Sequence, residues 1–115
     1  MQRGEQDPVS VEATEAGVVR ISLHGEIDMS GFDELDAMLA EANARTTDVV
    51  EIDLSRVTFM DSHGIRLLVR ARDRAQEHGR RLRLIDPGPS ILRLLEIVEL
   101  SHLFEIEGDG QAGPS

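Results

Sequence analysis

The 115-residue chain contains no cysteine, so it has no disulfide, no thiolate metal site and no cysteine nucleophile. Tryptophan and tyrosine are absent and only three phenylalanines occur, so there is no row of aromatic side chains on which single-stranded nucleic acid stacks. The apolar runs are only a few residues long, far below the roughly 20 residues that span a bilayer. The first seven residues are polar and contain no signal-peptide core. We therefore expect a cytoplasmic protein with no membrane insertion and no cofactor.

Lysine is absent as well, because all 12 basic residues are arginines, and they face 22 acids for a net charge of −10. An acidic chain repels nucleic acid, so we expect no nucleic-acid partner. The charge is uneven, since residues 62–83 contain seven arginines and two acids while both flanking segments are acidic. Such a block is usually a solvated helix face, and the alternative is a surface that contacts a partner. The four histidines have no metal-ligand spacing, so we expect no metal site.

Hydrophobic patterning predicts one α/β domain over residues 9–106, with flexible termini at 1–8 and 107–115. The expected strands cover residues 9–14, 18–24, 49–54, 81–86 and 103–106, and the expected helices begin after Ser30, at about Ile65 and at Pro89. The first two strands form a hairpin through a turn at residues 15–17. Helices separate the later strands, which are therefore expected to pair in parallel. The prediction is a mixed sheet of four to five strands with about three helices packed on it.

Capping residues set the predicted helix boundaries. Ser30 is the expected N-cap of the first helix, with Asp33 three residues later as a weak capping-box partner. Residues 25–29 before it are expected to form a loop. Gly79 is a suitable residue to end the second helix.

The most informative segment is residues 59–64, Phe-Met-Asp-Ser-His-Gly, which lies between a predicted buried strand and a predicted helix. Ser62 is therefore expected at or next to a helix N-terminus, where backbone N–H groups are unpaired and the helix dipole is positive. The commonest role of a serine there is N-capping, and Asp61 is equally suited to it. The alternative is an exposed hydroxyl that carries a phosphate, which a helix N-terminus accommodates.

The sequence gives less support to an enzyme than to a binding module. Asp61, Ser62 and His63 do not form a catalytic triad as sequence neighbours, because a triad is defined by mutual geometry. Met60 occupies the place of the first glycine in a G-x-S-x-G nucleophile elbow. Asp28 and Asp61 are expected at one end of the sheet, but two such carboxylates make a weak Mg²⁺ site and loop carboxylates usually cap. We therefore expect a binding module and not an enzyme.

Six segments form a recognisable pattern along the chain: residues 25–28 (GEID), 50–55 (VEIDLS), 57–65 (VTFMDSHGI), 79–84 (GRRLRL), 94–100 (LLEIVEL) and 103–104 (LF). Together they resemble the STAS domain of anti-anti-sigma factors, also called anti-sigma factor antagonists. The segment 57–65 is similar to the family's D-S-S/T-G-L loop. The resemblance extends from about Val9 to Ile106 and implies a STAS-like fold.

The resemblance also implies a function. In the family the serine after the aspartate, which is Ser62 here, is phosphorylated by an anti-sigma factor that is also a serine kinase. The unphosphorylated form binds the anti-sigma factor and frees the sigma factor, the phosphorylated form releases it, and a PP2C-type phosphatase restores binding. The alternative is a STAS subunit that is not a phosphoswitch, such as the small cytoplasmic component of a lipid-transport ABC complex.

The resemblance places the partner-binding surface around Ser62. The residues expected there are Asp28, Met29, Asp61, Ser62, His63, Gly64 and Arg66, with Arg70 at the margin. Two positions depart from the family pattern. His63 replaces a small Ser or Thr, and among contact with a phosphate, hindrance of the kinase and exposure to water we expect the last. Glu99 replaces a glycine, so we expect the end of the third helix to differ.

Overall fold

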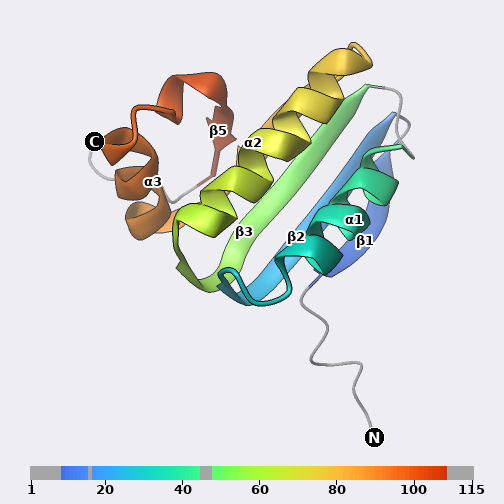
Figure 1. Ribbon diagram of the computed structural model, residues 1–115. Coiled ribbons are helices and arrows are strands. Elements are labelled where there is room, and N and C mark those ends of the chain that lie inside the picture. Colours follow the sequence, from blue (N-terminus) through green and yellow to red (C-terminus); the bar gives the residue numbers. More distant parts are fainter. Residues whose placement is uncertain (1–8, 16, 45–47, 109–115) are drawn as a thin grey trace, which may run out of the picture.

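Five strands form one sheet with the helices packed on one of its faces (Figure 1). The computed structural model describes residues 9–15, 17–44 and 48–108. Its elements are β1 (Val9–Glu15), β2 (Val18–Ile27), α1 (Phe32–Asn43), β3 (Val49–Met60), α2 (Ser62–Glu77), β4 (Arg81–Ile85), α3 (Gly88–Ile97), the 3₁₀ turn η2 (Ser101–Leu103) and β5 (Glu105–Glu107). The predicted order of elements and the predicted fold class are confirmed.

The strands lie in the sheet in their order along the chain, β1-β2-β3-β4-β5. β1 pairs with β2 in antiparallel orientation, and the other three pairings are parallel. The predicted hairpin edge is therefore confirmed. Parallel strands point the same way, so β2 and β3 end at the same edge of the sheet, where α1 and α2 begin (Figure 1).

One face of the sheet and the inner sides of the helices enclose the hydrophobic core. Alternate residues of the central strands point into it, as the period of a strand requires. The fully buried large side chains are Ile21, Leu23, Ile27, Leu39, Val50, Ile52, Leu54, Leu67, Leu68, Leu84 and Leu95. Each such residue contributes about 1.5–3 kcal/mol of burial free energy, so the core fixes α1 and α2 firmly on the sheet.

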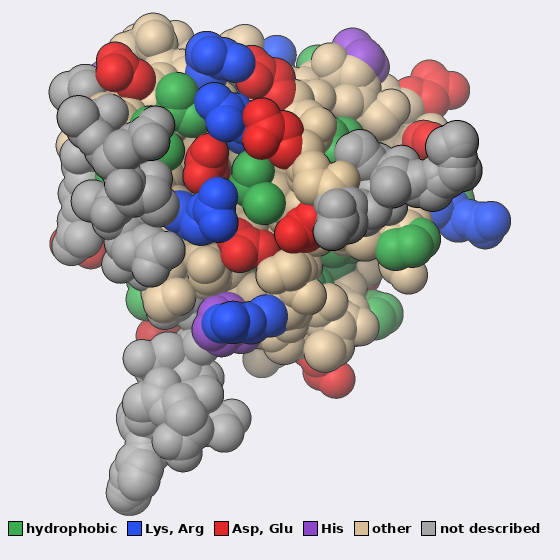
Figure 2. All heavy atoms as spheres, turned by 180° about the vertical axis from the view of Figure 1, so that it is seen from behind, with side chains coloured by type: hydrophobic (Ala, Val, Ile, Leu, Met, Phe, Trp, Pro, Cys, Tyr) green, Lys and Arg blue, Asp and Glu red, His purple; other side chains and the backbone are tan. Residues whose placement is uncertain are grey.

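The opposite face of the sheet carries a row of charges of alternating sign, visible across the centre of Figure 2. Arg20, Glu51, Arg83 and Glu105 occupy matching register positions on four neighbouring strands. The Glu51 carboxylate accepts hydrogen bonds from Arg20 Nε at 3.0 Å and from Arg83 Nη1 at 3.0 Å. Glu51 is only 7% exposed, so both arginines are needed to compensate its charge. Arg83, which belongs to the arginine-rich segment 62–83, is therefore part of this row.

The two central strands are longer than predicted, since β2 continues to Ile27 and β3 continues to Met60. The expected loop at residues 25–29 is wrong for its first three residues. Gly25 has a φ of 81° and lies where the register between the two strands shifts, so it is a bulge within the strand. Residues 55–59 of β3 are largely exposed, so their pattern lacks the apolar alternation that reveals a strand.

The last strand is shorter and later than predicted. Ser101–Leu103 form the turn η2, and β5 begins only at Glu105. Glu107, which the sequence placed in a flexible terminus, pairs with Ile85 in β5. Of the predicted flexible termini, 1–8 and 107–115, residues 1–8 and 109–115 lie outside the described residues, as does residue 16 of the predicted turn.

The end of α3 follows the left-handed pattern that the sequence was expected to lose. Glu99 adopts a φ of 61°. Its N–H donates to the Glu96 carbonyl at 3.0 Å, and the Leu100 N–H donates to the Leu95 carbonyl at 2.8 Å. These two bonds make a Schellman motif. The expectation of a different helix end is wrong, because the backbone bonds hold Glu99 in a conformation that normally favours glycine.

Replacing Glu99 with glycine is expected to raise the free energy of unfolding by about 0.5–1 kcal/mol, since glycine adopts a positive φ without strain. Urea unfolding followed by circular dichroism measures the change. Glu99→Ala is the matched control, because it removes the side chain and keeps the strain, so it should leave the stability nearly unchanged. A destabilised glycine variant would contradict the proposed strain.

Candidate functional site

The ends of β2 and β3 bring together residues from two distant parts of the sequence. Ile27 and Met60 are register partners, and the Asp61 N–H donates to the Ile27 carbonyl at 3.3 Å. Asp28 directly follows β2 and Asp61 directly follows β3, so both lie at the same edge of the sheet. The expectation that these two acids meet at one end of the sheet is therefore met.

Asp61, and not Ser62, caps α2. Its Oδ1 accepts a hydrogen bond from the His63 N–H at 2.8 Å, while Ser62 is the first helical residue and is exposed. Burial raises the pKa of the Asp61 carboxyl, but the hydrogen bond from the His63 backbone N–H, the nearby His63 ring and the Gly64 N–H lower it, and the net pKa lies below its ordinary value. The Ser62 hydroxyl is left without a capping role.

The His63 ring was expected to face water, but the structure turns one of its nitrogens inward. Its Nδ1 lies 3.4 Å from Asp61 Oδ1, a close polar contact that is longer than a normal hydrogen bond. That nitrogen is buried and has no hydrogen-bond partner among the described residues, although a third of the side chain is exposed. The ring is therefore folded back against the cap of its own helix.

Gly64 allows α2 to begin in close contact with the strand ends. It is buried, and a Cβ atom there would overlap Met60 Cγ and lie 2.9 Å from Met60 Sδ and 3.2 Å from Ile27 Cγ2. Real Cβ atoms do not come as close as the two Met60 atoms would lie, and the Ile27 contact would be unusually tight. Because Gly64 has no side chain, α2 can begin close to the strand ends, and this fixes the distance of Ser62 from the sheet.

A tight turn connects β2 to α1. Asp28 Oδ1 accepts a hydrogen bond from the Ser30 N–H at 3.0 Å, and the Phe32 N–H donates to the Met29 carbonyl at 3.1 Å. The N-cap of α1 is Gly31, with a φ of 76° and no side-chain bond, so the predicted Ser30 cap is wrong. The turn leaves Met29 67% exposed.

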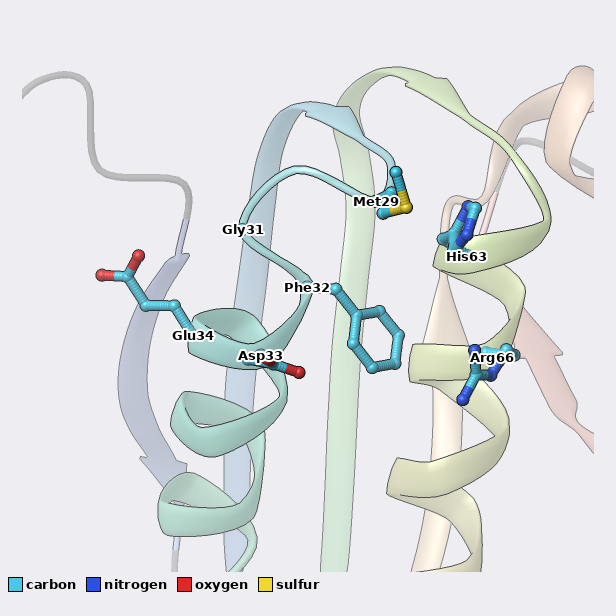
Figure 3. Close-up of a pocket in the computed structure, with 7 residues that line it drawn as sticks. All are labelled: Met29, Gly31, Phe32, Asp33, Glu34, His63 and Arg66. Atoms are coloured by element: carbon cyan, nitrogen blue, oxygen red, sulfur yellow. The ribbon is translucent and has the colours of Figure 1, made fainter.

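A groove of about 400 Å³ runs between the first turns of α1 and α2 (Figure 3). Its lining consists of Met29, Gly31, Phe32, Asp33, Glu34, His63 and Arg66. The guanidinium of Arg66 lies 5.1 Å from the centre of the Phe32 ring, which is a cation–π contact between the two helices. Phe32 lies in the helix predicted after Ser30, and nothing in its spacing indicated this contact. The sequence shows that Asp33 and Glu34 are acidic, but it does not indicate that they line a groove.

Arg70 lies outside this groove. Its Nε and Nη2 donate to the two oxygens of Asp36 on α1, each at 2.9 Å, and Arg74 Nη2 donates to Asp36 Oδ1 at 2.9 Å. The Arg70 hydrogen bond lowers the pKa of Asp36, burial opposes this, and Arg74 lowers it further, so that the net pKa is below 3.8. Asp36 thus ties the two helices together.

Asp36→Asn is expected to lower the free energy of unfolding at pH 7 by about 1–2 kcal/mol, because both arginines lose a charged acceptor. The folded-state pKa lies below the ordinary value of 3.8, so this stabilisation is present above pH 3.8 and is lost as the pH falls through the folded-state pKa. The two proteins should therefore converge in acid when unfolded with urea at a series of pH values. Glu41→Gln, on the exposed side of α1, is the control. A difference that stays constant with pH would contradict the ion-pair explanation.

Within the described part of the chain, no three histidine, aspartate or glutamate side chains gather as a metal site. Over the same residues, no helix is both long and apolar enough to cross a bilayer.

The comparison with family models decides the family. The model described as "Mlab, STAS domain" matches residues 10–105. The chain belongs to the STAS domain family. The resemblance inferred from the sequence is therefore confirmed, and the loop at residues 57–65 lies within the match.

Named relatives of this STAS domain are anti-sigma factor antagonists. The chain is 27% identical over 86 residues to the anti-sigma-B factor antagonist of Staphylococcus epidermidis, which covers 75% of this chain and 80% of the relative. It is similar to the anti-sigma factor antagonist SpoIIAA in its unphosphorylated form, with 25% identity, a TM-score of 0.66, and 86% and 87% of the two chains covered. It is also similar to an anti-sigma factor antagonist from Mycobacterium paratuberculosis, with 28% identity, a TM-score of 0.71, and 85% and 82% covered.

Proposed function

We propose that this STAS domain is an anti-sigma factor antagonist that is switched off by phosphorylation of Ser62. The observation that carries the proposal is the position of Ser62, exposed at the first residue of α2 while Asp61 provides the cap. The hydroxyl is therefore accessible to a kinase, and its modification removes no bond that holds the helix. The names of the relatives supply the class of partner.

The docking surface of the proposal is the sheet edge around Ser62. It consists of Asp28, Met29, Asp61, Ser62, His63 and Arg66. Gly64, which the sequence also placed there, is buried beneath this surface and contributes only by letting α2 begin close to the strand ends. A phosphate adds about −1.5 to −2 charges beside the carboxylate of Asp61. The helix N-terminus offsets about 0.3–1 kcal/mol of the resulting repulsion, so the fold tolerates the modification. A partner lying over the site would have to desolvate a dianion next to carboxylates, which is costly. The switch thus works by blocking a surface and not by reshaping the domain.

The partners of the proposal are an anti-sigma factor that is also a serine kinase and a PP2C-type phosphatase. The kinase transfers the γ-phosphoryl group of ATP to the Ser62 oxygen and releases ADP and the hydroxyl proton. The phosphatase hydrolyses the phosphoester and restores binding. The chain itself is a binding module that catalyses neither step.

A second function is favoured by the name of the matching family model, which refers to Mlab. In this case the domain is a STAS subunit of a lipid-transport ABC complex, and Ser62 is not a regulatory phosphosite. The same docking edge would then contact a transport protein.

Incubation with the anti-sigma factor kinase of the host and ATP separates the two functions. Mass spectrometry should locate one phosphate on Ser62, and the Ser62→Ala variant should accept none. A wild-type chain that remains unmodified while the kinase modifies its other substrates would favour the transport function. A turnover activity that disappears in Ser62→Ala would instead show an enzyme.

A further inference from the structure

Six of the seven arginines between residues 62 and 83 have a polar partner. The partners are Asp36 for Arg70 and Arg74, the Leu103 carbonyl for Arg72, Asn43 for Arg80, Glu105 for Arg81 and Glu51 for Arg83. Arg66 is the exception: within the part of the chain that the structure describes, its guanidinium has no hydrogen bond or ion pair and only covers the Phe32 ring. It is therefore a cation with unused donors beside the proposed phosphosite.

The helix directs Arg66 toward Ser62. The two residues are four apart on α2, a spacing that puts their Cβ atoms about 5–6 Å from each other on one face. Side chains on a helix lean toward its N-terminus, so Arg66 covers the turn that contains Ser62. Both residues are exposed, and Figure 3 shows the Arg66 side chain on the side of α2 that faces α1.

We propose that Arg66 is the counter-ion of the phosphoryl group on Ser62, and that it leaves the Phe32 ring to bind two phosphate oxygens. The inference rests on the proposed function, because it concerns the phosphorylated state. A planar guanidinium matches two phosphate oxygens, and such a charge-assisted pair is stronger than an exposed cation–π contact. The pair also offsets the repulsion between the phosphate and Asp61.

A consequence concerns the groove between α1 and α2. When Arg66 turns to the phosphate, the face of Phe32 loses its cover and the cation leaves the groove. Phosphorylation then changes two adjacent surfaces at once, Ser62 itself and the groove lined by Met29 and Phe32. Arg66 binds the phosphate in this proposal and takes no part in phosphoryl transfer.

The test uses the full chain with phosphoserine incorporated at position 62 through an expanded genetic code, so that no kinase is needed. ³¹P NMR follows the second ionisation of the phosphate against pH in the wild-type background, in Arg66→Gln and in Arg93→Gln, an exposed arginine of α3. The phosphate pKa is expected to be about half a unit higher in Arg66→Gln than in the wild type. Arg93→Gln should titrate like the wild type. Equal titration of Arg66→Gln and the wild type would overturn the proposal.

A second readout needs no substitution at Arg66. In the wild-type phosphoprotein, the Arg66 Nε–H resonance and the Phe32 ring resonances should shift with the midpoint of the phosphate ionisation. Resonances that do not respond to that ionisation would overturn the proposal even if Arg66→Gln fails to fold. Failure of the proposed function is distinguishable from failure of this proposal. A chain that no kinase modifies would contradict the proposed function, but the chain with incorporated phosphoserine would still show whether Arg66 pairs with the phosphate.

Discussion

Ser62→Asp is expected to weaken binding to the anti-sigma factor by about 100-fold relative to Ser62→Ala, roughly 3 kcal/mol. The aspartate puts a permanent negative charge next to Asp61, at the centre of the proposed docking surface. An interface there has to bury two adjacent carboxylates, and an exposed pair with Arg66 offsets only a small part of that cost. Titration calorimetry of the purified variants against the anti-sigma factor measures the difference.

The controls for Ser62→Asp separate charge at the site from charge in general. Ser10→Asp adds the same charge to an exposed serine of β1 and should bind like the wild type. Circular dichroism should show all variants folded, because an acid in the first turn of α2 is compatible with the helix dipole. If folded Ser62→Asp binds as tightly as Ser62→Ala, the proposed switch is wrong.

Gly64→Ala is expected to lower the free energy of unfolding by about 1–3 kcal/mol, the usual range for an added carbon in a full core. Alanine normally favours a helix by about 1 kcal/mol over glycine, so the overlap has to exceed that gain. We expect it to do so because Met60 is buried and its Cγ is too close to the backbone to move aside freely. Urea unfolding gives the change in stability.

Ser62→Ala is the matched control for Gly64→Ala, since it lies two residues earlier in the same helix and on its exposed side. It should change stability by less than about 0.5 kcal/mol. A Gly64→Ala variant as stable as the wild type would mean that α2 can rise from the strand ends without cost. In that case the position of Ser62 does not depend on Gly64.

Alternating apolar residues were sufficient to predict the buried parts of the strands. Val19, Ile21 and Leu23 follow the period of a strand, and all three are buried. The end of β3 was missed because residues 55–59 are mostly exposed, and the end of β2 was missed because the bulge at Gly25 interrupts its alternation. Local capping preferences were equally insufficient at Ser30, where a glycine with positive φ takes the cap position.

The part of the site that follows from the direction of the strands was predictable from the sequence. Parallel strands end at one edge, so Asp28 and Asp61 were expected to lie together, and the helix after Asp61 placed Ser62 at its start. The contact between Phe32 and Arg66 was not predictable, because it depends on how two helices pack. The same is true of His63, whose ring position follows from the conformation of the cap.

Since Asp61 closes the helix on its own, position 62 accepts new chemistry without loss of the fold. The natural chain has no thiol, so Ser62→Cys would give a protein with a single reactive sulfur, exposed at a helix start that favours the thiolate. A fluorophore attached there reports whatever approaches this edge of the sheet, and a photocrosslinker attached there captures it. The native surface thus provides a ready position for a probe that identifies the binding protein directly.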